Sequence, residues 1–308
     1  MRGLFVNQLK ANCSIYESGV MIFNALKSED YQLEYLEVAV KDMNTRDYGQ
    51  YDFYIFNWHH NTLPISSGTI KRITGLTIGI LLEVGPREMK PFLTEDMFDA
   101  YMVIDPTKEK HDKFYPFPRP LEKVDSLLPL LSDKPVFGIF GFLVPGKDFA
   151  EPIRVAISSG IECIIRMNIP EATFTGRNYG SLEAVKSFGE RLKSFHTDKV
   201  DIQITHDYMS KPDLIRWCSQ NSLNIFPYYR TLPGLSAVTD QAIVANRGIA
   251  ITDCDTFRHM HKYISYFPKQ DYLQLTTSTL PGIKQMHEDW SNKNFVIKFK
   301  EILLERLK

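Results

Sequence analysis

The sequence predicts an α/β protein of two doubly wound domains, and three observations favour this fold class. Its 308 residues are too many for one small core and suit two domains of roughly 120–150 residues each. In both halves short apolar runs alternate with helical patterns, which is typical of parallel sheets covered by helices. The segment Phe114–Pro120 between the halves holds three prolines, which cannot continue a helix or a central strand, so it is the expected linker.

The first half contains five expected strands and one clear helical pattern. The run Thr77–Leu82 is almost entirely apolar, as in a strand that is buried on both faces. Val20–Leu26 has helical spacing, with Ser18 as the expected N-cap. The strands are expected at Leu4–Val6, Leu33–Val38, Phe53–Phe56, Thr77–Leu82 and Tyr101–Ile104.

The second half repeats the alternation of strands and helices. Ser210 is the expected cap of one helix, since Pro212 then falls in its first turn. Strands are expected at Val136–Phe140, Glu162–Met167, Val200–Ile204, Leu223–Phe226 and Ile249–Thr252. Helices are expected at Phe149–Ser158, Ser181–Phe195, Pro212–Ser219, Val238–Asn246 and, closing the chain, Asn294–Leu307.

The amino-acid composition and charge exclude several classes of partner and cofactor. The net charge of −1 and the pI of about 6.7 give no general case for nucleic acid or an anionic membrane as partner. The four cysteines have no zinc-type spacing and read as reduced thiols, which favours the cytoplasm. No apolar run approaches the roughly 20 residues of a transmembrane helix. No GxGxxG follows the first strand, so a dinucleotide cofactor is not expected.

Candidate general bases follow the strands of the first half, because doubly wound sheets bind ligands at the carboxyl ends of their strands. Glu83 closes an apolar strand, where a carboxylate is costly to bury without a partner. His59 and His60 follow the third strand, and a structural or merely exposed role is an equal alternative for either. Glu17 is placed in the loop after the first strand. No third ligand stands near the histidines, so no metal site is expected.

Two loops of the second half suit a phosphate. Gly141–Lys147 follows a strand and precedes a helix, and its glycines, its lysine and the helix N-terminus would favour an anion; an ordinary Gly/Pro turn is the alternative. The loop from Pro227 carries Tyr229 and Arg230 and leads to Asp240, which could hold a ribose or simply act as a first-turn acid. Asp253 and Asp255 form a DxD pair, for which helix capping is favoured over cation binding.

Several segments of the second half resemble the GT-B glycosyltransferases that use nucleotide sugars. Leu235–Thr252 resembles their run S-S…D-A-L-A-x-G-[RK]-P-V-[IV]-x-S, and Gly138–Lys147 resembles their G-x-x-G…K-[GN] loop. His206–Arg216 resembles the segment near the nucleotide base, and Trp290 with the closing helix resembles the C-terminal helix of the family. In the first half the resemblance rests on strand order and on the strand that follows Asp52.

The resemblance implies a role for each matching residue. Lys147 would contact the diphosphate with Gly141 beside it, and Arg166 is the candidate for a second basic group. The base would lie against Tyr208 and Met209, the phosphates against Gly234, Leu235 and Ser236, and the ribose against Asp240. Leu232 stands where many retaining members carry a glutamate, so an inverting reaction with Glu83 or a histidine as base is equally open.

The implied fold is GT-B: two Rossmann-like doubly wound domains that face each other across a cleft, with the C-terminal helix crossing back to the first domain. The expected domains are an acceptor domain over residues 1–120, a donor domain over 121–285 and the closing helix over 286–308. The implied function is transfer of a sugar from a nucleoside-diphosphate sugar to a glycan or surface-precursor acceptor, without a required metal or cofactor. The alternatives are a phage-type DNA glycosyltransferase and a non-catalytic nucleotide-sugar-binding protein. The sequence does not fix the oligomeric state.

Overall fold

The computed structural model describes residues 1–10, 13–82, 97–172, 180–229, 234–268 and 270–307. The chain divides into two compact units. Unit 1 comprises Met1–Leu121, Pro233–Leu235 and Asp289–Lys308, and unit 2 comprises Glu122–Leu232 and Ser236–Glu288. The first unit therefore includes the closing helix, although some 170 residues of sequence separate that helix from Leu121.

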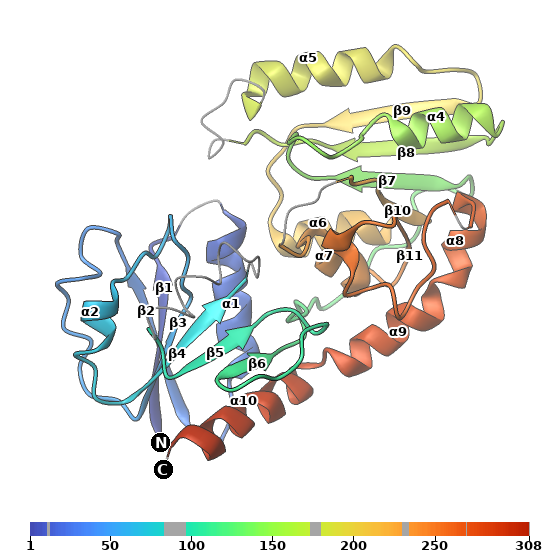
Figure 1. Cartoon of the computed structure of the whole chain (residues 1–308). Coiled ribbons are helices and arrows are strands. Elements are labelled where there is room, and N and C mark those ends of the chain that lie inside the picture. The colour runs from blue at the N-terminus through green and yellow to red at the C-terminus, as the bar shows by residue number, and fades with distance from the viewer. Residues whose placement is uncertain (11–12, 83–96, 173–179, 230–233, 269, 308) are drawn as a thin grey trace. The chain divides into compact units, whose positions relative to one another are not determined.

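Unit 1 is built on a six-stranded parallel sheet in the order β2-β1-β3-β4-β5-β6 (Figure 1). Every residue of β3 and β4 is buried, which explains why these strands are continuous apolar runs rather than alternating ones. The strands are β1 (Arg2–Gln8), β2 (Gln32–Val38), β3 (Phe53–Phe56), β4 (Leu76–Leu81), β5 (Ala100–Val103) and β6 (Phe114–Pro116).

The two faces of this sheet are covered differently. Helices α1 (Ser14–Leu26) and α10 (Asn292–Arg306) contact each other and pack on one face. The other face carries only the short α2 (Ser67–Ile70) within the described residues, and side chains from connecting segments such as Met43 and Leu63 complete its core. The central strands are thus buried on both faces, as is typical of parallel sheets, whereas the edge strand β2 is mostly half-buried.

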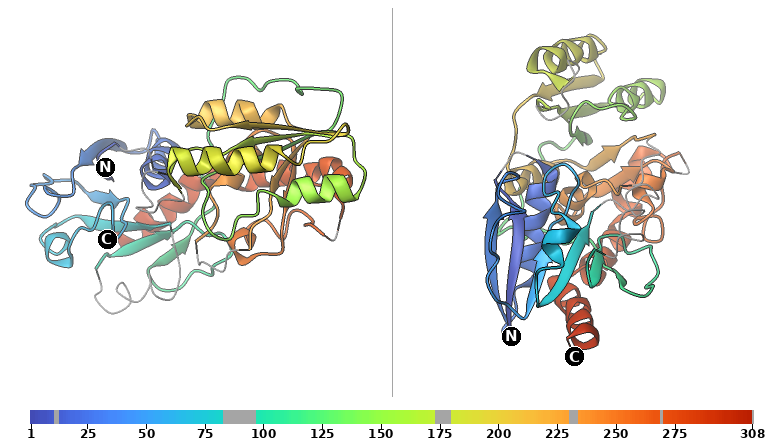
Figure 2. Two further views of the ribbon diagram at one scale, coloured as in Figure 1. Left: turned by 90° about the horizontal axis from the view of Figure 1, so that it is seen from above. Right: turned by 60° about the vertical axis from the view of Figure 1, so that its left-hand side comes forward.

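Helix α10 contributes one apolar stripe to the core of unit 1. Phe295, Phe299, Ile302 and Leu303 are all buried there, at the spacing of one helix face. The Phe299 ring lies 5.6 Å from the ring of Phe53, between centroids, in an edge-on arrangement. In Figures 1 and 2 the red α10 ends at the edge of the sheet where β1 begins.

Unit 2 is built on a five-stranded parallel sheet in the order β11-β10-β7-β8-β9. Helices α4, α5 and α8 supply core residues on one face, and α6 and α7 contact each other, with Trp217 of α6 packed on Phe140. The strands are β7 (Val136–Phe140), β8 (Cys163–Asn168), β9 (Val200–Thr205), β10 (Leu223–Phe226) and β11 (Gly248–Ile251). The helices are α4 (Glu151–Ser158), α5 (Leu182–Lys193), α6 (Lys211–Ser219), α7 (Val238–Val244), α8 (Tyr272–Ser278) and α9 (Leu280–Asp289), with a 3₁₀ turn η3 (Asp255–Phe257).

Both sheets contain a point at which the strand order reverses. In unit 1 the chain leaves β1 for β2 on one side and reaches β3 on the other. In unit 2 it runs from β7 through β8 to β9 and then returns to β10 on the far side of β7. At such points the loops after the two central strands lead away in opposite directions, and doubly wound proteins bind their ligands there.

Three local predictions differ from the structure. Phe114–Pro116 of the expected linker is strand β6, which is permitted because β6 lies at the sheet edge. Helix α1 begins at Ser14 with Cys13 as its N-cap, so Ser18 lies inside the helix and does not cap it. Asp253 and Asp255 do not cap a helix over Phe257–Tyr263: only η3 forms there, and Cys254 stands at its N-cap.

For the remaining strands and helices of the described chain, most ends lie within two residues of the expected position. Ser210 caps α6 by accepting a hydrogen bond from the Asp213 backbone N–H, as predicted. Within the described residues, no helix combines the length and apolar character needed to cross a bilayer.

We expect Phe299→Ala to destabilise unit 1 by about 3–5 kcal/mol, because it removes a buried ring and leaves a cavity. Leu304→Ala on the same helix is the matched control, since Leu304 is 79% exposed and should change stability by less than about 0.5 kcal/mol. Urea unfolding of both variants measures the difference. Equal stabilities would contradict the packing of α10 into this core.

Candidate functional site

In unit 2 the loops after β7 and β10 are joined by backbone hydrogen bonds at the reversal of strand order. The Asp148 N–H donates to the Pro227 carbonyl at 3.0 Å, and the Tyr229 N–H donates to the Gly146 carbonyl at 2.8 Å. Lys147 and Tyr228 form the isolated antiparallel bridge between these bonds. The loop that carries Lys147 is therefore fixed to the end of the neighbouring strand.

Gly141 marks the centre of this site. Its φ of +126° lies where residues with a Cβ rarely go. A Cβ added there would stand 2.8 Å from Lys147 Nζ, 3.6 Å from Tyr228 Oη and 3.6 Å from Val238 Cγ1. The end of β7, its loop, the end of β10 and the start of α7 thus converge on one point, where the backbone conformation favours glycine.

The ammonium group of Lys147 lies over an aromatic face. Its Nζ is 4.8 Å from the centroid of the Tyr228 ring, a cation–π geometry. Tyr228 is fully buried, its carbonyl accepts a hydrogen bond from Thr252, and its ring packs on Phe257 at 5.2 Å. A positive charge held in this way is suited to an anionic group of a ligand without further rearrangement.

The N-terminus of α4 does not provide the phosphate site that the sequence suggested. Asp148 accepts hydrogen bonds from the Ala150 and Glu151 backbone N–H groups at 3.2 and 3.1 Å, and it forms an ion pair with Arg154 at 2.5 Å. The positive end of the α4 dipole is thus already paired with the carboxylate of Asp148. A phosphate placed there would face the charge of Asp148, so Lys147 is the better anion-binding group of this loop.

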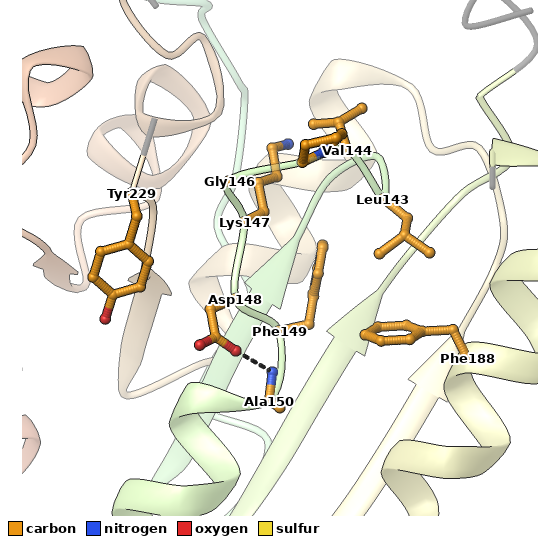
Figure 3. A pocket seen from close by; sticks show the side chains of 10 residues that line it. Leu143, Val144, Gly146, Lys147, Asp148, Phe149, Ala150, Phe188 and Tyr229 are labelled. Carbon is orange, nitrogen blue, oxygen red and sulfur yellow. Dashed lines mark hydrogen bonds between the residues drawn. The ribbon is translucent and has the colours of Figure 1, made fainter. Parts of the chain in front are cut away.

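A hollow of about 460 Å³ lies beside the same loop. Figure 3 shows the rings of Tyr229, Phe149 and Phe188 around it, with Leu143 turned toward Phe188. The side chain of Lys147 points away from Asp148 and Tyr229 in this view. The hollow is therefore lined by apolar and aromatic side chains together with Lys147 and Asp148, and the ammonium group of Lys147 lies beside Gly141.

The segment before α7 is held by hydroxyl and backbone contacts. The Ser236 N–H donates to the Thr256 carbonyl at 3.1 Å, and Thr239 Oγ1 donates to the Ser236 carbonyl at 2.9 Å. His259 Nε2 lies 3.2 Å from Thr239 Oγ1. Ser236 and Leu235 are buried, Gly234 is half-buried, and Asp240 is buried in the first turn of α7. Phosphate contacts by the first three residues and a ribose contact by Asp240 stay predictions.

Arg166 is the residue that the resemblance offered as a second basic group with Lys147. The residue lies within β8, paired in register with Gly138. Its guanidinium donates to Asn221 Oδ1 at 3.0 Å and stacks on Trp217 at 4.8 Å. Burial lowers the pKa of Arg166, and these contacts compensate the buried charge. The Arg166 side chain therefore packs against α6.

Tyr208 and Met209 follow β9, where the sequence placed them. Tyr208 is 42% exposed, and its ring lies 6.4 Å from that of Phe142, with the planes 28° apart. Met209 is half-buried. Phe142 was not among the predicted site residues, although an aromatic residue directly after the glycine at a strand end was a usable signal.

The candidate bases of unit 1 occupy different settings. Glu17 lies in the first turn of α1 rather than in a loop. His59 is half-buried and its Nδ1 accepts a hydrogen bond from the Asn61 N–H at 3.3 Å. Burial, with a smaller effect of His60, lowers the pKa of His59 to about 4. His60 is exposed, and the centroids of the two rings lie 4.4 Å apart.

A buried amide pair at the reversal point of unit 1 was missed. Asn57 Nδ2 donates to Asn7 Oδ1 at 2.8 Å and to the Ile15 carbonyl at 2.9 Å. Asn7 Nδ2 donates to Tyr35 Oη at 2.9 Å, and Tyr16 Oη donates to Glu37 at 2.8 Å. The sequence signal was an asparagine directly after each of two expected strands: Asn7 follows Leu4–Val6, and Asn57 follows Phe53–Phe56.

Glu83 and Arg230 lie outside the described residues. Asp255 forms an ion pair with Arg258 at 3.0 Å, which uses one member of the DxD pair. Within the described part of the chain, no group of three or more His, Cys, Asp or Glu side chains is arranged to hold a metal ion.

Comparison with known proteins supports the fold through structure and not through sequence. No protein-family model matches the chain, and no curated protein is significantly similar to it. HepE (Alr3699) from Anabaena, solved with UDP and glucose, matches with a TM-score of 0.67 and 9% identity over 99% of this chain and 100% of that one. The UDP-forming α,α-trehalose-phosphate synthase of Burkholderia xenovorans, solved with glucose-6-phosphate, matches with a TM-score of 0.65 and 8% identity over 100% of both chains.

The pneumococcal O-GlcNAc transferase GtfA, solved with UDP and GlcNAc, matches with a TM-score of 0.54 and 12% identity over 83% of this chain and 57% of that one. These proteins are GT-B glycosyltransferases, and the likeness runs through both units of the chain. The α/β fold predicted from the sequence, GT-B with two Rossmann-like units, is therefore confirmed.

We expect Gly141→Ala to destabilise unit 2 by about 2–3 kcal/mol, because alanine is strained at this φ and its methyl group displaces Lys147. Gly160→Ala is the matched control. Gly160 also has a positive φ, +65°, but a Cβ there meets no atom within 4 Å, so about 1 kcal/mol is expected. Urea unfolding followed by tryptophan fluorescence compares them, and equal losses would contradict the crowding at Gly141.

We expect His59 to titrate near pH 4 in the folded protein. Between pH 6.5 and 4 the unfolded chain binds the proton that buried His59 does not, so the free energy of unfolding falls as the pH drops through this window and levels off below it. An NMR titration of the His59 ring, assigned with His59→Gln, measures the midpoint. A midpoint at or above 6.5 would show that burial does not control this histidine.

Proposed function

We propose that the protein is a glycosyltransferase that moves a sugar from a nucleoside-diphosphate sugar to an acceptor hydroxyl. One observation carries the proposal: Lys147, Gly141 and Tyr228 converge at the reversal point of a GT-B donor-type unit. Two structural neighbours were solved with UDP and a sugar, which supports a nucleotide sugar as the co-substrate.

The proposed chemistry needs stabilisation of the leaving diphosphate, because negative charge develops on it as the bond to the sugar breaks. Lys147 would supply the positive charge, with its position set by Tyr228 and by the close approach that Gly141 permits. Ser236 and the backbone beside it would complete the phosphate contacts, and Asp240 would hold the ribose. We propose that this charge takes the place of a required metal ion.

The acceptor would bind to unit 1, with a glycan or surface precursor as the proposed class. The half-buried Tyr16–Glu37 pair places hydrogen-bonding groups near its reversal point, which suits hydroxyl groups, and the buried amides of Asn7 and Asn57 order the backbone there. The proposed base is one of the residues Glu83, His59, His60 and Glu17. With a pKa of about 4, His59 is neutral at pH 7 and can accept a proton, although only weakly.

The central test is Lys147→Ala. Loss of a charged hydrogen-bond donor should weaken UDP binding about 10- to 100-fold and lower the rate of sugar transfer or donor hydrolysis about 100- to 1,000-fold. Calorimetry and product analysis with UDP-, GDP- and ADP-sugars, in the presence of EDTA, measure both effects.

Lys134→Ala is the control, since the ion pair of Lys134 with Glu162 is exposed and the variant should behave like the unaltered protein. Absence of binding by every nucleoside diphosphate would refute the proposed function. Binding that EDTA abolishes would refute its metal-independent form.

A further inference from the structure

A second hollow, of about 630 Å³, lies at the amino ends of the strands of unit 1. Asp52 directly precedes β3, Asp99 directly precedes β5, and Thr74 lies two residues before β4. Arg306, the last residue of α10, also lines it. The polar groups proposed for the acceptor lie near the carboxyl ends of the strands, so this hollow is a separate site at the opposite edge of the same sheet.

The two carboxylates of the hollow are each held in place through one oxygen. Asp52 Oδ2 accepts a hydrogen bond from the Arg2 backbone N–H at 2.7 Å. Asp99 Oδ2 accepts hydrogen bonds from the backbone N–H and the hydroxyl of Thr77, at 2.8 and 2.7 Å. Both aspartates are exposed, and no described residue donates a hydrogen bond to either Oδ1. Each Oδ1 can therefore accept a hydrogen bond from a ligand.

Arg306 adds hydrogen-bond donors in a fixed position. Its Nε donates to Tyr115 Oη at 3.0 Å, and its Nη2 donates to the Asp112 carbonyl at 2.9 Å. Tyr115 Oη donates in turn to Glu305 at 2.8 Å. A guanidinium group carries five N–H donors, and the Arg306 side chain is 30% exposed. The two bonds thus orient the group and leave further N–H groups for a ligand.

A hydroxyl and an aromatic ring complete the polar lining. Thr74 is exposed, and a threonine hydroxyl both donates and accepts. Tyr51 is half-buried, its Oη donates to Glu34 at 2.9 Å, and the Arg2 guanidinium lies 5.1 Å from its ring centroid. The ring is therefore held in place and adds apolar contact area to the hollow.

The mixture of groups distinguishes between classes of ligand. A phosphate would face two carboxylates, and a purely cationic ligand would face the guanidinium of Arg306. Within the described residues no group of three or more His, Cys, Asp or Glu side chains is arranged to hold a metal ion. A neutral ligand with many hydroxyl groups fits both kinds of group, because a hydroxyl donates to a carboxylate and accepts from a guanidinium.

We propose that this hollow is a second carbohydrate-binding site, which takes a neutral oligosaccharide. Asp52 and Asp99 accept hydrogen bonds from its hydroxyl groups, Arg306 donates to them, and the Tyr51 ring contacts a sugar ring. The volume of about 630 Å³ lies within the range of roughly 300–1,000 Å³ that is usual for small-molecule sites. The site uses no residue of the proposed donor site, so it does not depend on the proposed sugar transfer.

The experiment screens the full chain against an array of neutral oligosaccharides and measures the affinity of the tightest binder by calorimetry, with spermidine as a cationic probe. The variants are Asp99→Asn and Arg306→Gln, which remove a charge, and Thr74→Val, which removes a hydroxyl at nearly constant shape. Asp133→Asn is the matched control, because Asp133 is an exposed aspartate of unit 2. Thermal unfolding of each variant verifies that it is folded.

Asp99→Asn and Arg306→Gln should each bind the oligosaccharide about ten-fold more weakly, since each loses a charged hydrogen-bonding group. Thr74→Val should bind it about three-fold more weakly, and Asp133→Asn should bind as the unaltered protein does. If a charge variant does not fold, Thr74→Val decides.

Three results would overturn the proposed site. The first is that no neutral oligosaccharide binds, and the second is that the folded variants of the hollow bind it as tightly as the unaltered protein. The third is binding of spermidine alone, since the hollow would then be a cation site. None of these measurements involves a nucleotide sugar, so each of these results leaves the proposed glycosyltransferase function standing.

Discussion

Two backbone hydrogen bonds, from Asp148 to Pro227 and from Tyr229 to Gly146, determine the geometry of the candidate site. They join a loop that follows β7 to one that follows β10, at the place where the order of strands reverses. Because these bonds involve the main chain, they set the path of the loop whatever side chains it carries. The position of Lys147 over Tyr228, and the need for glycine at residue 141, both follow from that path.

The points at which the strand order reverses carry different polar groups in the two units. In unit 2 an ammonium group lies beside an aromatic ring and a glycine with positive φ, an arrangement suited to an anion. In unit 1 the corresponding place holds the fully buried amides of Asn7 and Asn57, which order the backbone around it, and the Tyr16–Glu37 pair, whose carboxylate accepts a hydrogen bond. The cationic group of unit 2 agrees with the proposed donor role of that unit, and the hydrogen-bonding groups of unit 1 agree with the proposed binding of a hydroxyl-bearing acceptor.

The N-terminus of α4 shows how one local contact can determine which group of a loop is available to a ligand. A free helix N-terminus attracts anions, but Asp148 already accepts hydrogen bonds from two N–H groups of α4 and pairs with Arg154. The proposed anion-binding group is therefore Lys147 and not the helix terminus. Asn168 has a comparable influence on β8 and β9, since its carbonyl and amide connect the residues that precede Phe142 and Tyr208.

The sequence by itself determined the two sheets and most helix bounds, because these depend on local apolar periodicity and on caps such as Ser210. It also placed Gly141 and Lys147 in a loop after a strand, where loops of parallel sheets gather, and Tyr208 followed from the family resemblance. Tertiary structure alone decided that Arg166 packs against α6 and that Phe142 pairs with Tyr208. These outcomes depend on register and on contacts between residues far apart in the chain, which no local pattern encodes.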